Sequence, residues 1–347
     1  MRLVSASNIS SVIRRTMALP YVQWFWGEAL AFDGIYLASR GLGDAAGEEW
    51  IRSRVLDWGG QVNAPLAPSL HVTPGGLLAR LYEESQDERY LNPLMTLYQL
   101  YEGVAVDRTG CLLHRTDVVD WHSLAWVDAM YYDGPFLARL GRALDKPCLY
   151  NVAGSVMRGY VAALWDHNSH LFSHYYNGDS EANNAVHWAR GNGWALLGLV
   201  DMAAVLPAHH WARDWSQGVM YRLVQRLMEW QDASGFWHTV IDDAQSYLEG
   251  SLAAMFVAAV AKAKRHGLLQ TDPGISWRRA WNAVEKLSDG DGSCRQMSDV
   301  TPWGDDLDHY RKIGFAVTPW GQGAWLRAAI EAYRLSLRAD YNGSVVS

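Results

Sequence analysis

Apolar residues recur with a helical period in two stretches of the chain, within residues 90–101 and 220–228. In each stretch the apolar positions fall three or four residues apart, which places them on one face of an amphipathic helix. We predict that these two helices cover a core with one face and meet solvent with the other. The two series are Tyr90, Leu94, Leu97, Tyr98 and Tyr101, and Met220, Leu223, Val224, Leu227 and Met228.

Two other stretches, residues 195–206 and 252–263, are apolar on nearly all sides. A helix without a polar face must be enclosed by its neighbours, so these stretches predict inner helices. Pro93 near the start of one predicted helix and Pro207 just after another fit the usual positions of proline at helix ends.

A turn of the form Asp-x-x-Gly, followed by aromatic or histidine residues and then an apolar helix, recurs along the chain. It begins at Asp107 and Asp232, and looser copies begin at Asp166 and Asp289. The copies lie roughly 60 residues apart, which is the length of a pair of antiparallel helices with their connections. Six such hairpins fill the chain and predict an all-α fold, a closed (α/α)6 barrel.

No linker rich in Pro, Gly or Ser divides the chain, so we expect residues 1–347 to form a single domain. In a toroid of helical hairpins the inner helices point their ends into a shared bowl, and loops on such a rigid scaffold commonly carry function. The recurrent turns are expected to bring several polar side chains to one rim of that bowl. These are His114, Asp128, His174, Arg190 and His238.

The amino-acid composition limits the classes of partner that the protein is expected to bind. Apolar residues make up 49% of the chain and charged residues 19%, as in ordinary folded proteins. A formal charge of −7 without a basic run argues against nucleic acid or an anionic membrane as a partner. The absence of a long apolar run or signal-like segment leads us to expect a cytoplasmic protein. The 18 Trp and 17 Tyr far exceed the 7 Phe, which is typical of carbohydrate clefts and also of large helical cores.

Several familiar sites can be set aside. The chain lacks a dinucleotide-binding fingerprint, a phosphate-binding loop and a Gly-x-Ser-x-Gly motif. Residues 289–293 resemble the start of a calcium loop but lack the required Gly and Glu. His167, His170 and His174 do not have the spacing of a zinc motif. We therefore expect neither a metal nor an organic cofactor.

Asp128 is the carboxylate most suited to proton transfer. It lies among aromatic and apolar residues, between Trp126 and an apolar helical stretch, where partial burial raises the pKa of a carboxyl group. The alternative is that Asp128 caps a helix or forms a salt bridge. Asp133 precedes a Gly-Pro pair and is interpreted as structural, and Glu249 is expected to cap the helix that follows it.

The run His187 to Trp194 places Trp188, Arg190 and Trp194 within eight residues. An arginine offers a planar fork of donors that fits a carboxylate, and a tryptophan offers a broad apolar face with a polar edge. Together they favour a ring-shaped acidic ligand. The alternative is a structural Arg–Trp stack at a helix start.

Five groups of residues along the chain share one family resemblance: 126–128 with 135–138, 188–194, 231–238, 247–249 and 320–324. They resemble the unsaturated glycuronyl hydrolases of glycoside hydrolase families 88 and 105, and family 105, the unsaturated rhamnogalacturonyl hydrolases, most closely. The resemblance covers nearly the whole chain and implies an (α/α)6 barrel. It also implies hydration of the C4=C5 bond of an unsaturated uronic acid at the non-reducing end of an oligosaccharide left by a lyase, with Asp128 as acid and then base.

The resemblance further implies that Arg190 holds the uronate or its neighbouring hydroxyls. It implies that Trp26, Trp188 and Trp194 line the sugar site and that His114 and His174 lie near the sugar. His71 stands where members of the family commonly have a second Asp, so water orientation or hydroxyl recognition is expected to differ there.

Two other functions remain open at this point. One is a sugar epimerase of the N-acylglucosamine 2-epimerase type, which resembles the same architecture and uses histidines as acid and base. The other is a helical-repeat protein that binds saccharides without converting them. The sequence does not choose between galacturonyl and glucuronyl units, nor between a monomer and a homodimer.

Overall fold

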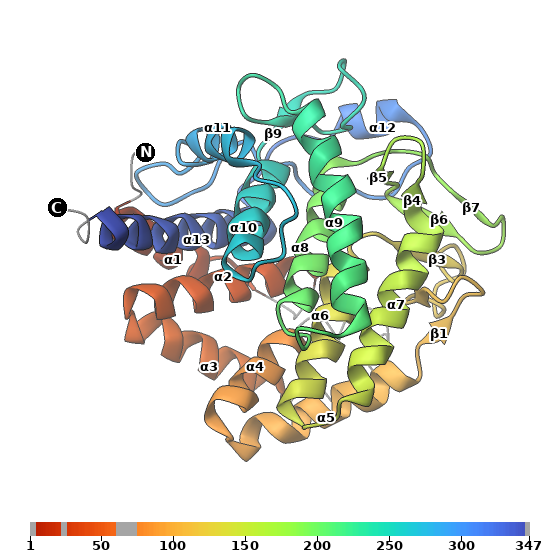
Figure 1. Cartoon of the computed structure of the whole chain (residues 1–347), viewed down its shortest axis with the longest axis horizontal. Helices are drawn as coiled ribbons and strands as arrows, with labels where there is room; N and C mark the ends of the chain where they lie inside the picture. Colours follow the sequence, from red (N-terminus) through yellow and green to blue (C-terminus); the bar gives the residue numbers. More distant parts are fainter. Residues whose placement is uncertain (1–4, 22–25, 60–74, 344–347) are drawn as a thin grey trace.

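The computed structural model describes residues 5–21, 26–59 and 75–343. Within these residues an inner ring of helices surrounds the axis of the molecule, and each helix of the ring packs against the next. The last of them, α13, packs against the first, α2, and closes the ring (Figure 1). The inner helices are α2 (Trp26–Leu42), α4 (Gly75–Ser85), α6 (Ala129–Ala143), α8 (Ala189–Ala203), α10 (Ser251–Arg265) and α13 (Pro319–Gly343).

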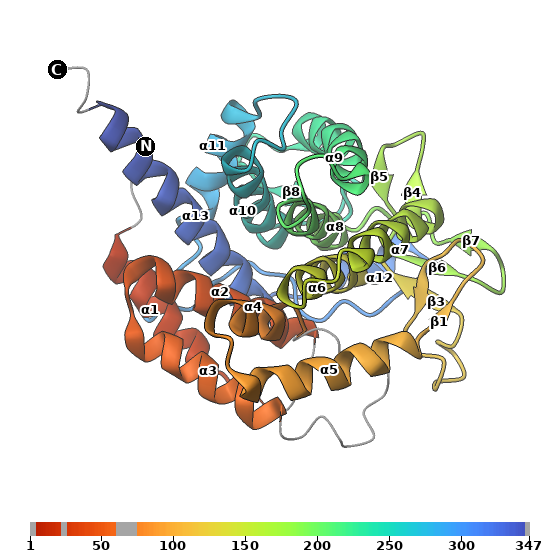
Figure 2. The same cartoon turned by 60° about the horizontal axis from the view of Figure 1, so that its bottom comes forward.

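A second set of helices lies outside this ring, and each outer helix precedes an inner one in the chain (Figure 2). This alternation of outer and inner helices confirms the predicted (α/α)6 architecture. The outer helices are α1 (Ala6–Met17), α3 (Ala45–Gly59), α5 (Glu88–Glu102), α7 (Cys148–Leu164), α9 (Trp211–Trp230) and α11 (Gly274–Val284), and the short α12 (Leu307–Arg311) follows α11.

Short antiparallel strands occupy the loops that lead from outer to inner helices. The loops before α6 and α8 share one sheet of strand order β3-β6-β7, and the other sheets are two-stranded, β1-β2, β4-β5 and β8-β9. The strands are β1 (Ala105–Val106), β2 (Leu112–Leu113), β3 (Leu124–Trp126), β4 (Trp165–Asp166), β5 (Leu171–Phe172), β6 (Tyr175–Asn177), β7 (Ala182–Asn183), β8 (Trp237–His238) and β9 (Leu248–Glu249).

The burial of the helices follows the apolar pattern. In the outer helices α5 and α9, most of the predicted face is buried, with Tyr98 and Met228 packed at its edge. In the inner helix α8 all residues are buried, and in α10 nearly all are. Both predictions are therefore confirmed.

One boundary differs from the pattern, because α8 begins at Ala189 and ends at Ala203 rather than covering residues 195–206. The glycines at its start are helical. A β-carbon on Gly191 would lie 2.6 Å from Cγ1 of Val127, so this glycine serves a close approach between α8 and the loop before α6.

The recurrent turns have a common geometry and follow four of the outer helices. In three of them the glycine has a positive φ, as at Gly110 with 89°, and its N–H donates to the carbonyl of the aspartate three residues earlier. In the looser copy that begins at Asp166, His170 has a φ of 56° and its N–H donates to the carbonyl of Asp166. These turns therefore end the outer helices at one end of the barrel.

Candidate active site

Strand pairing places Asp128 beside His174. Trp126 at the end of β3 pairs with Tyr175 of β6, and the N–H of Val127 donates to the carbonyl of His174 at 3.0 Å. Asp128 follows directly and precedes α6, so its carboxyl oxygen Oδ2 lies 4.0 Å from Nε2 of His174. Two residues far apart in the sequence thus meet at the mouth of the ring.

The carboxyl group of Asp128 is partly buried and poorly paired. Its side chain keeps 17% of its exposure, and its Oδ2 has no hydrogen-bond partner among the described residues. It makes no side-chain cap to α6, so the capping alternative does not apply. Burial raises the pKa of Asp128 to about 6, against the opposing effect of the nearby Arg190 charge. A carboxyl group with this pKa can both donate and accept a proton near neutral pH.

His174 is held as a neutral imidazole. Its Nδ1 lies 2.6 Å from the hydroxyl of Tyr310 in α12, and its ring packs on Trp188 with centroids 4.3 Å apart. Burial, together with the charges of Arg190 and His309, lowers its pKa to about 3. His174 therefore presents Nε2 to Asp128 without adding a charge.

Aromatic side chains form the wall beside these two residues. The ring of Trp194, in the first turns of α8, lies 5.0 Å from Tyr131 and 6.0 Å from Tyr132, and Trp26 meets it edge-on at 6.5 Å. Trp26 also packs on Trp320 at 4.7 Å. The indole N–H groups of Trp188 and Trp194 and the hydroxyl of Tyr132 are buried without a partner among the described residues. The wall thus combines apolar faces with free polar edges.

Arg190 is fully buried, and its contacts lie within the protein. Its Nη1 donates to the carbonyl of Ser298 at 2.7 Å, and its Nη2 donates at 3.0 Å to both the carbonyl of Asp299 and the hydroxyl of Thr301. The guanidinium also lies over the ring of Trp188, 4.5 Å from its centroid. The Arg–Trp stack is therefore present, and the predicted contact of Arg190 with a uronate stays a prediction.

His114 and His238 form their hydrogen bonds with residues other than Asp128. His114 is buried between α6 and α7, where its Nε2 lies 2.8 Å from Oδ2 of Asp133 and 3.1 Å from the Tyr160 hydroxyl. This contact gives Asp133 the structural role expected of it. His238 lies on β8, where its Nδ1 contacts the carbonyl of Ser246. His71 lies outside the described residues.

Glu249 caps α10, as predicted. Its Oε2 accepts from the N–H of Ser251 at 2.8 Å, and its Oε1 accepts from the N–H of Leu252 at 3.0 Å. The same end of the barrel therefore contains the start of α10 as well as those of α6 and α8.

The structure adds residues that the sequence analysis missed. Tyr310 binds His174 from a five-residue helix that has no periodic pattern, and Asn184 donates to the Tyr310 hydroxyl at 3.1 Å. Trp320 packs on Trp26 within a segment that carried the family resemblance but was given no role. Tyr132 was visible as an aromatic neighbour of Asp128, and only its contact with Trp194 shows its place in the wall.

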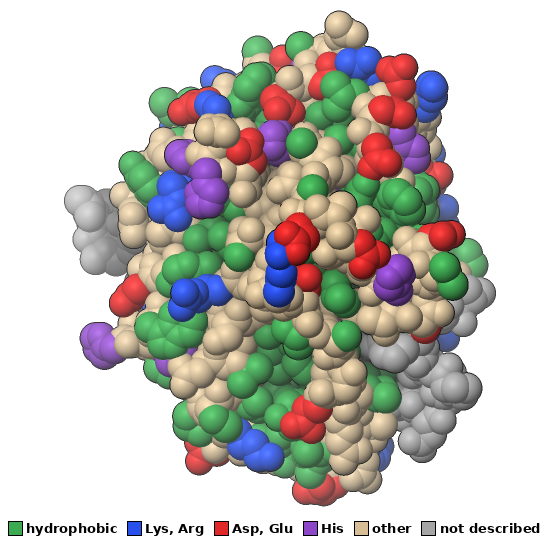
Figure 3. Space-filling model, turned by 90° about the vertical axis from the view of Figure 1, so that its right-hand side faces the viewer, with side chains coloured by type: hydrophobic (Ala, Val, Ile, Leu, Met, Phe, Trp, Pro, Cys, Tyr) green, Lys and Arg blue, Asp and Glu red, His purple; other side chains and the backbone are tan. Residues whose placement is uncertain are grey.

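Figure 3 shows the side of the molecule that carries the β3-β6-β7 sheet, where acidic side chains and a basic one lie near the centre, with hydrophobic and histidine side chains around them. Among the residues that the structure describes, no group of three or more His, Cys, Asp or Glu is arranged to hold a metal ion. In the same part of the chain, no helix is both long and apolar enough to cross a membrane.

Comparisons with known proteins agree on one family. A model of Glycosyl Hydrolase Family 88 matches residues 7–336. The unsaturated rhamnogalacturonyl hydrolase YesR of Bacillus subtilis (strain 168) is 26% identical over 327 residues, which covers 91% of each chain. The unsaturated 3S-rhamnoglycuronyl hydrolase of Formosa agariphila is 23% identical over 226 residues, which covers 60% of this chain and 58% of that one.

A solved structure shows the same fold. The crystal structure of a possible member of the GH105 family from Salmonella enterica serovar Paratyphi A superposes with a TM-score of 0.86 at 25% sequence identity. The superposition covers 97% of this chain and 96% of that one. The similarity therefore extends over the whole barrel.

Proposed function

Since the chain belongs to glycosyl hydrolase family 88, we propose that it removes a Δ4,5-unsaturated uronic acid from the non-reducing end of short oligosaccharides. The names of YesR and of the Formosa enzyme, both unsaturated uronyl hydrolases, support this substrate class. Membership of a hydrolase family favours hydrolysis over the epimerase and over a protein that only binds saccharides.

The observation that carries the proposal is the state of Asp128. Its carboxyl oxygen Oδ2 is buried and unpaired, its pKa is raised to about 6, and the neutral His174 lies 4.0 Å away. A general acid works best with a pKa near the working pH. Most surface aspartates have lost their proton at that pH, whereas Asp128 retains it in part.

The chemistry follows from the vinyl ether in the substrate. Asp128 donates its proton to C4, and positive charge develops at C5 and the ring oxygen. The resulting carboxylate takes a proton from the water that attacks C5. The hemiketal formed in this way opens to a 5-keto sugar, the bond from C1 to the rest of the saccharide breaks, and that saccharide leaves with a hydroxyl group. Asp128 is returned to its acid form.

The surroundings of Asp128 suit an acidic sugar ring. Trp26, Trp188 and Trp194 are proposed to line the ring, and the unpaired indole N–H groups of Trp188 and Trp194 suit its hydroxyls. The N-terminal ends of α6 and α8 also point into this region, and helix N-termini favour a negative charge. This positive potential supports uronate binding, although both terminal nitrogens of Arg190 are occupied within the protein.

In the proposed role, Arg190 acts through the segment of residues 298–301 that it binds. Four hydrogen bonds from its two terminal nitrogens hold this segment beside Trp320, whose indole N–H donates to the carbonyl of Ser298 at 3.0 Å. A contact between a uronate and the terminal nitrogens of Arg190 requires the segment to give up one of these bonds, whereas Nε of Arg190 has no partner among the described residues.

The test follows the conjugated double bond by its ultraviolet absorbance. Unsaturated galacturonyl and glucuronyl disaccharides are supplied separately to the wild-type protein, to Asp128→Asn and to Asp120→Asn. The exposed Asp120 lies in the same loop and serves as the matched control. We expect wild type and Asp120→Asn to consume the chromophore and Asp128→Asn to lose about 10²-fold or more of the rate. Full retention of the chromophore by wild type, or full activity of Asp128→Asn, contradicts the proposal.

Three further expectations stay predictions. These are the single domain over residues 1–347, the cytoplasmic location and the monomeric or homodimeric state. Limited proteolysis, cell fractionation and size-exclusion chromatography, respectively, test them.

A further inference from the structure

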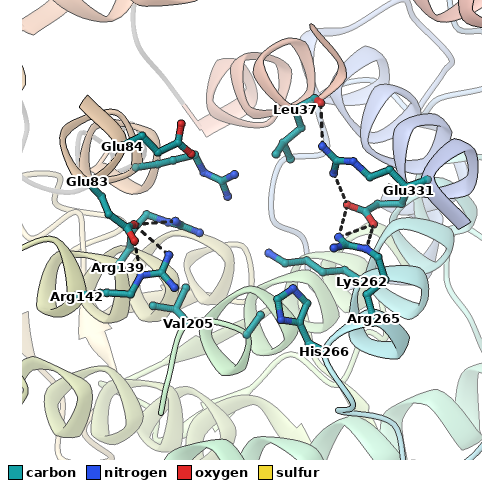
Figure 4. A pocket seen from close by; sticks show the side chains of 13 residues that line it. Leu37, Glu83, Glu84, Arg139, Arg142, Val205, Lys262, Arg265, His266 and Glu331 are labelled. Atoms are coloured by element: carbon teal, nitrogen blue, oxygen red, sulfur yellow. Dashed lines mark hydrogen bonds and ion pairs between the residues drawn. The ribbon is translucent and has the colours of Figure 1, made fainter. Parts of the chain in front are cut away.

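A cavity lies at the end of the barrel opposite Asp128. It has a volume of about 320 Å³ and is surrounded by the C-terminal halves of inner helices, among them α4, α6 and α10 (Figure 4). Asp128 precedes α6, whereas Arg139 and Arg142 near the end of α6 line this cavity. At a rise of about 1.5 Å per residue, the two sites lie roughly 20 Å apart along that helix.

The lining of this cavity is strongly basic. Six arginine or lysine side chains face three glutamates, and the balance is positive even with His266 counted as neutral. Burial and the charges of Lys262 and Arg265 lower the pKa of His266, which keeps it neutral. The six cations are Arg80, Arg139, Arg142, Lys262, Arg265 and Arg334, and the three glutamates are Glu83, Glu84 and Glu331.

Each glutamate that lines the cavity pairs either with two cations of the lining or with a cation outside it. Glu83 pairs with Arg142 at 2.6 Å and with Arg139 at 3.5 Å. Glu331 pairs with both Arg265 and Arg334, at 2.6 and 3.0 Å. Each of these carboxylates therefore neutralises only one of two cations. The third glutamate, Glu84, is engaged by Arg40, which is not part of the lining.

Two more cations remain after these pairs. Lys262 donates to Asp201 at 2.6 Å, but Asp201 is also bound by Arg327 at 2.8 Å. Arg80 makes no ion pair within the described residues, and its guanidinium lies 6.0 Å from the ring centroid of Tyr36. The wall thus holds more positive charge than its own carboxylates balance.

Attraction to helix ends does not account for all of this charge. The partial negative charge of a helix C-terminus acts within its last turn, where Arg142, Lys262 and Arg265 lie. Arg80 and Arg139 lie before the last turns of α4 and α6. Arg139 is buried to 8% exposure, and burial together with the charges of Arg80 and Arg142 lowers its pKa to about 9. Mutual repulsion of these arginines is a cost to the folded protein that a bound anion removes.

We propose that this cavity binds a compact oxyanion with two or more negative charges, of the kind found in phosphate esters and polycarboxylates. The planar fork of an arginine pairs with both kinds of group, and the volume of about 320 Å³ is at the lower end for small-molecule sites. Arg80 and Arg139 provide the unbalanced charge, and Lys262, Arg142, Arg265 and Arg334 complete the wall. The site is separate from the uronate site and does not depend on it.

The experiment measures anion binding to the full chain by calorimetry and by thermal unfolding at constant ionic strength in chloride. The probes are inorganic phosphate, glucose 6-phosphate and citrate, with acetate as the monovalent comparison. At least one multivalent anion is expected to bind at millimolar concentration or below and to raise Tm, whereas acetate does neither. Binding of phosphate and glucose 6-phosphate assigns a phosphate site, and binding of citrate alone assigns a polycarboxylate site.

Variants separate a binding site from a structural cluster. Arg80→Gln removes a cation without orphaning a carboxylate, so without anion its Tm is expected to equal or exceed that of wild type. Its affinity for the anion is expected to fall about tenfold or more. Arg295→Gln, which removes an exposed arginine paired with Asp289, is the matched control and leaves affinity unchanged.

Asp128→Asn also leaves anion affinity unchanged, which distinguishes this site from the uronate site. Absence of binding by all three multivalent anions, or unchanged affinity in Arg80→Gln, overturns the proposal. Neither result bears on the hydrolase activity.

Discussion

At the scale of single residues, the proposed chemistry depends on how few hydrogen bonds the Asp128 carboxyl group accepts. Its neighbour Asp133, five residues along, binds a histidine and a tyrosine hydroxyl, and Asp201 on the next inner helix binds an arginine and a lysine. Asp128 and Asp133 each have one buried carboxyl oxygen without a partner, but the other oxygen of Asp133 binds His114 and Tyr160. Three carboxylates in one barrel therefore have different roles because their hydrogen-bond partners differ.

The pKa of Asp128 predicts the pH dependence of the reaction. Burial raises this pKa to about 6, so the proton needed at C4 is present below that pH and is lost above it. We expect kcat/KM to be highest near or below pH 6 and to fall about tenfold per pH unit well above it. The measurement is kcat/KM on an unsaturated disaccharide between about pH 5 and 8, with circular dichroism over the same range as the control for folding. A constant or rising rate over this range assigns the proton to another group.

The sequence predicted Asp128 because apolar and aromatic neighbours surround it, and this signal is local. His174 was also predicted, from its place after a recurrent turn and from the family resemblance. Tyr310 and Asn184 could not be predicted, since they reach His174 from segments with no periodic pattern and their role depends on how those loops fold back. His114 was expected near the sugar, and its contact with Asp133 became visible only once α6 and α7 were placed.

At the scale of elements, short hairpins and helix starts determine where the side chains lie. The β3–β6 pairing joins the loops before α6 and α8, and this sheet fixes the distance between Asp128 and His174. A side chain at a helix start can also stabilise the helix itself, as Glu249 does for α10.

Replacing Glu249 by Ala is expected to destabilise the fold by about 2–4 kcal/mol. The change leaves two buried N–H groups of α10 without acceptors and removes a hydrogen bond to the Ser251 hydroxyl. The matched control is Asp87→Ala, because Asp87 caps α5 at an exposed site and its loss costs about 1 kcal/mol. Chemical denaturation of both variants gives the comparison, and equal losses contradict the special role of Glu249.

A second prediction at this scale concerns the seat of the β1–β2 hairpin on α7. A β-carbon on Gly159 would lie 2.1 Å from the backbone carbon of Gly110, which itself has a positive φ. Gly159→Ala is therefore expected to lower stability by about 2 kcal/mol or more, since backbone must move.

The helical Gly218 in α9 gives the opposite control, because nothing lies within 4 Å of its added β-carbon. Gly218→Ala is expected to raise stability by about 0.5–1 kcal/mol. Thermal unfolding of the two variants tests both signs, and an unchanged Tm in Gly159→Ala shows that the hairpin can shift without loss.

The pattern of the sequence predicted the outer and inner helices well, because burial leaves a direct mark on composition. The start of α8 was harder to predict, since Gly191 and Gly193 suggest a loop. They are helical because other parts of the chain approach them closely, which only the assembled barrel reveals.

At the scale of the whole molecule, charged side chains connect the inner helices across the ring. Arg327 of α13 binds Asp201 of α8 at 2.8 Å and the Tyr131 hydroxyl of α6 at 2.9 Å, and Lys262 of α10 binds the same Asp201. The closed ring was predictable from the number of hairpins, whereas this network was not, since its members lie on helices far apart in sequence.

Asp201→Asn is expected to destabilise the protein by about 3–5 kcal/mol at pH 7, because two buried cations lose their shared partner. Arg327 and Lys262 hold the pKa of Asp201 well below its usual range, although burial opposes them. The contribution of the charge is therefore complete above the unfolded-state pKa of about 4 and is lost as the pH falls below it.

Urea unfolding at about pH 7 and pH 3 measures this difference, which is expected to shrink at the lower pH. Asp289→Asn, which removes the exposed partner of Arg295, is the control and costs less than about 1 kcal/mol. A difference that stays the same at both pH values contradicts the assignment of the effect to the Asp201 charge.

The junction between α2 and α13 joins segments about 290 residues apart, and α13 supplies Trp320 to the aromatic wall near Asp128. While the ribosome is still synthesising residues before 319, the apolar sides of α2 and α10 have no covering helix, and the aromatic wall lacks Trp320. Activity therefore begins only after translation has passed α13. An incomplete translation product is left with exposed apolar surface and becomes a client for chaperones or proteases rather than a partly active hydrolase.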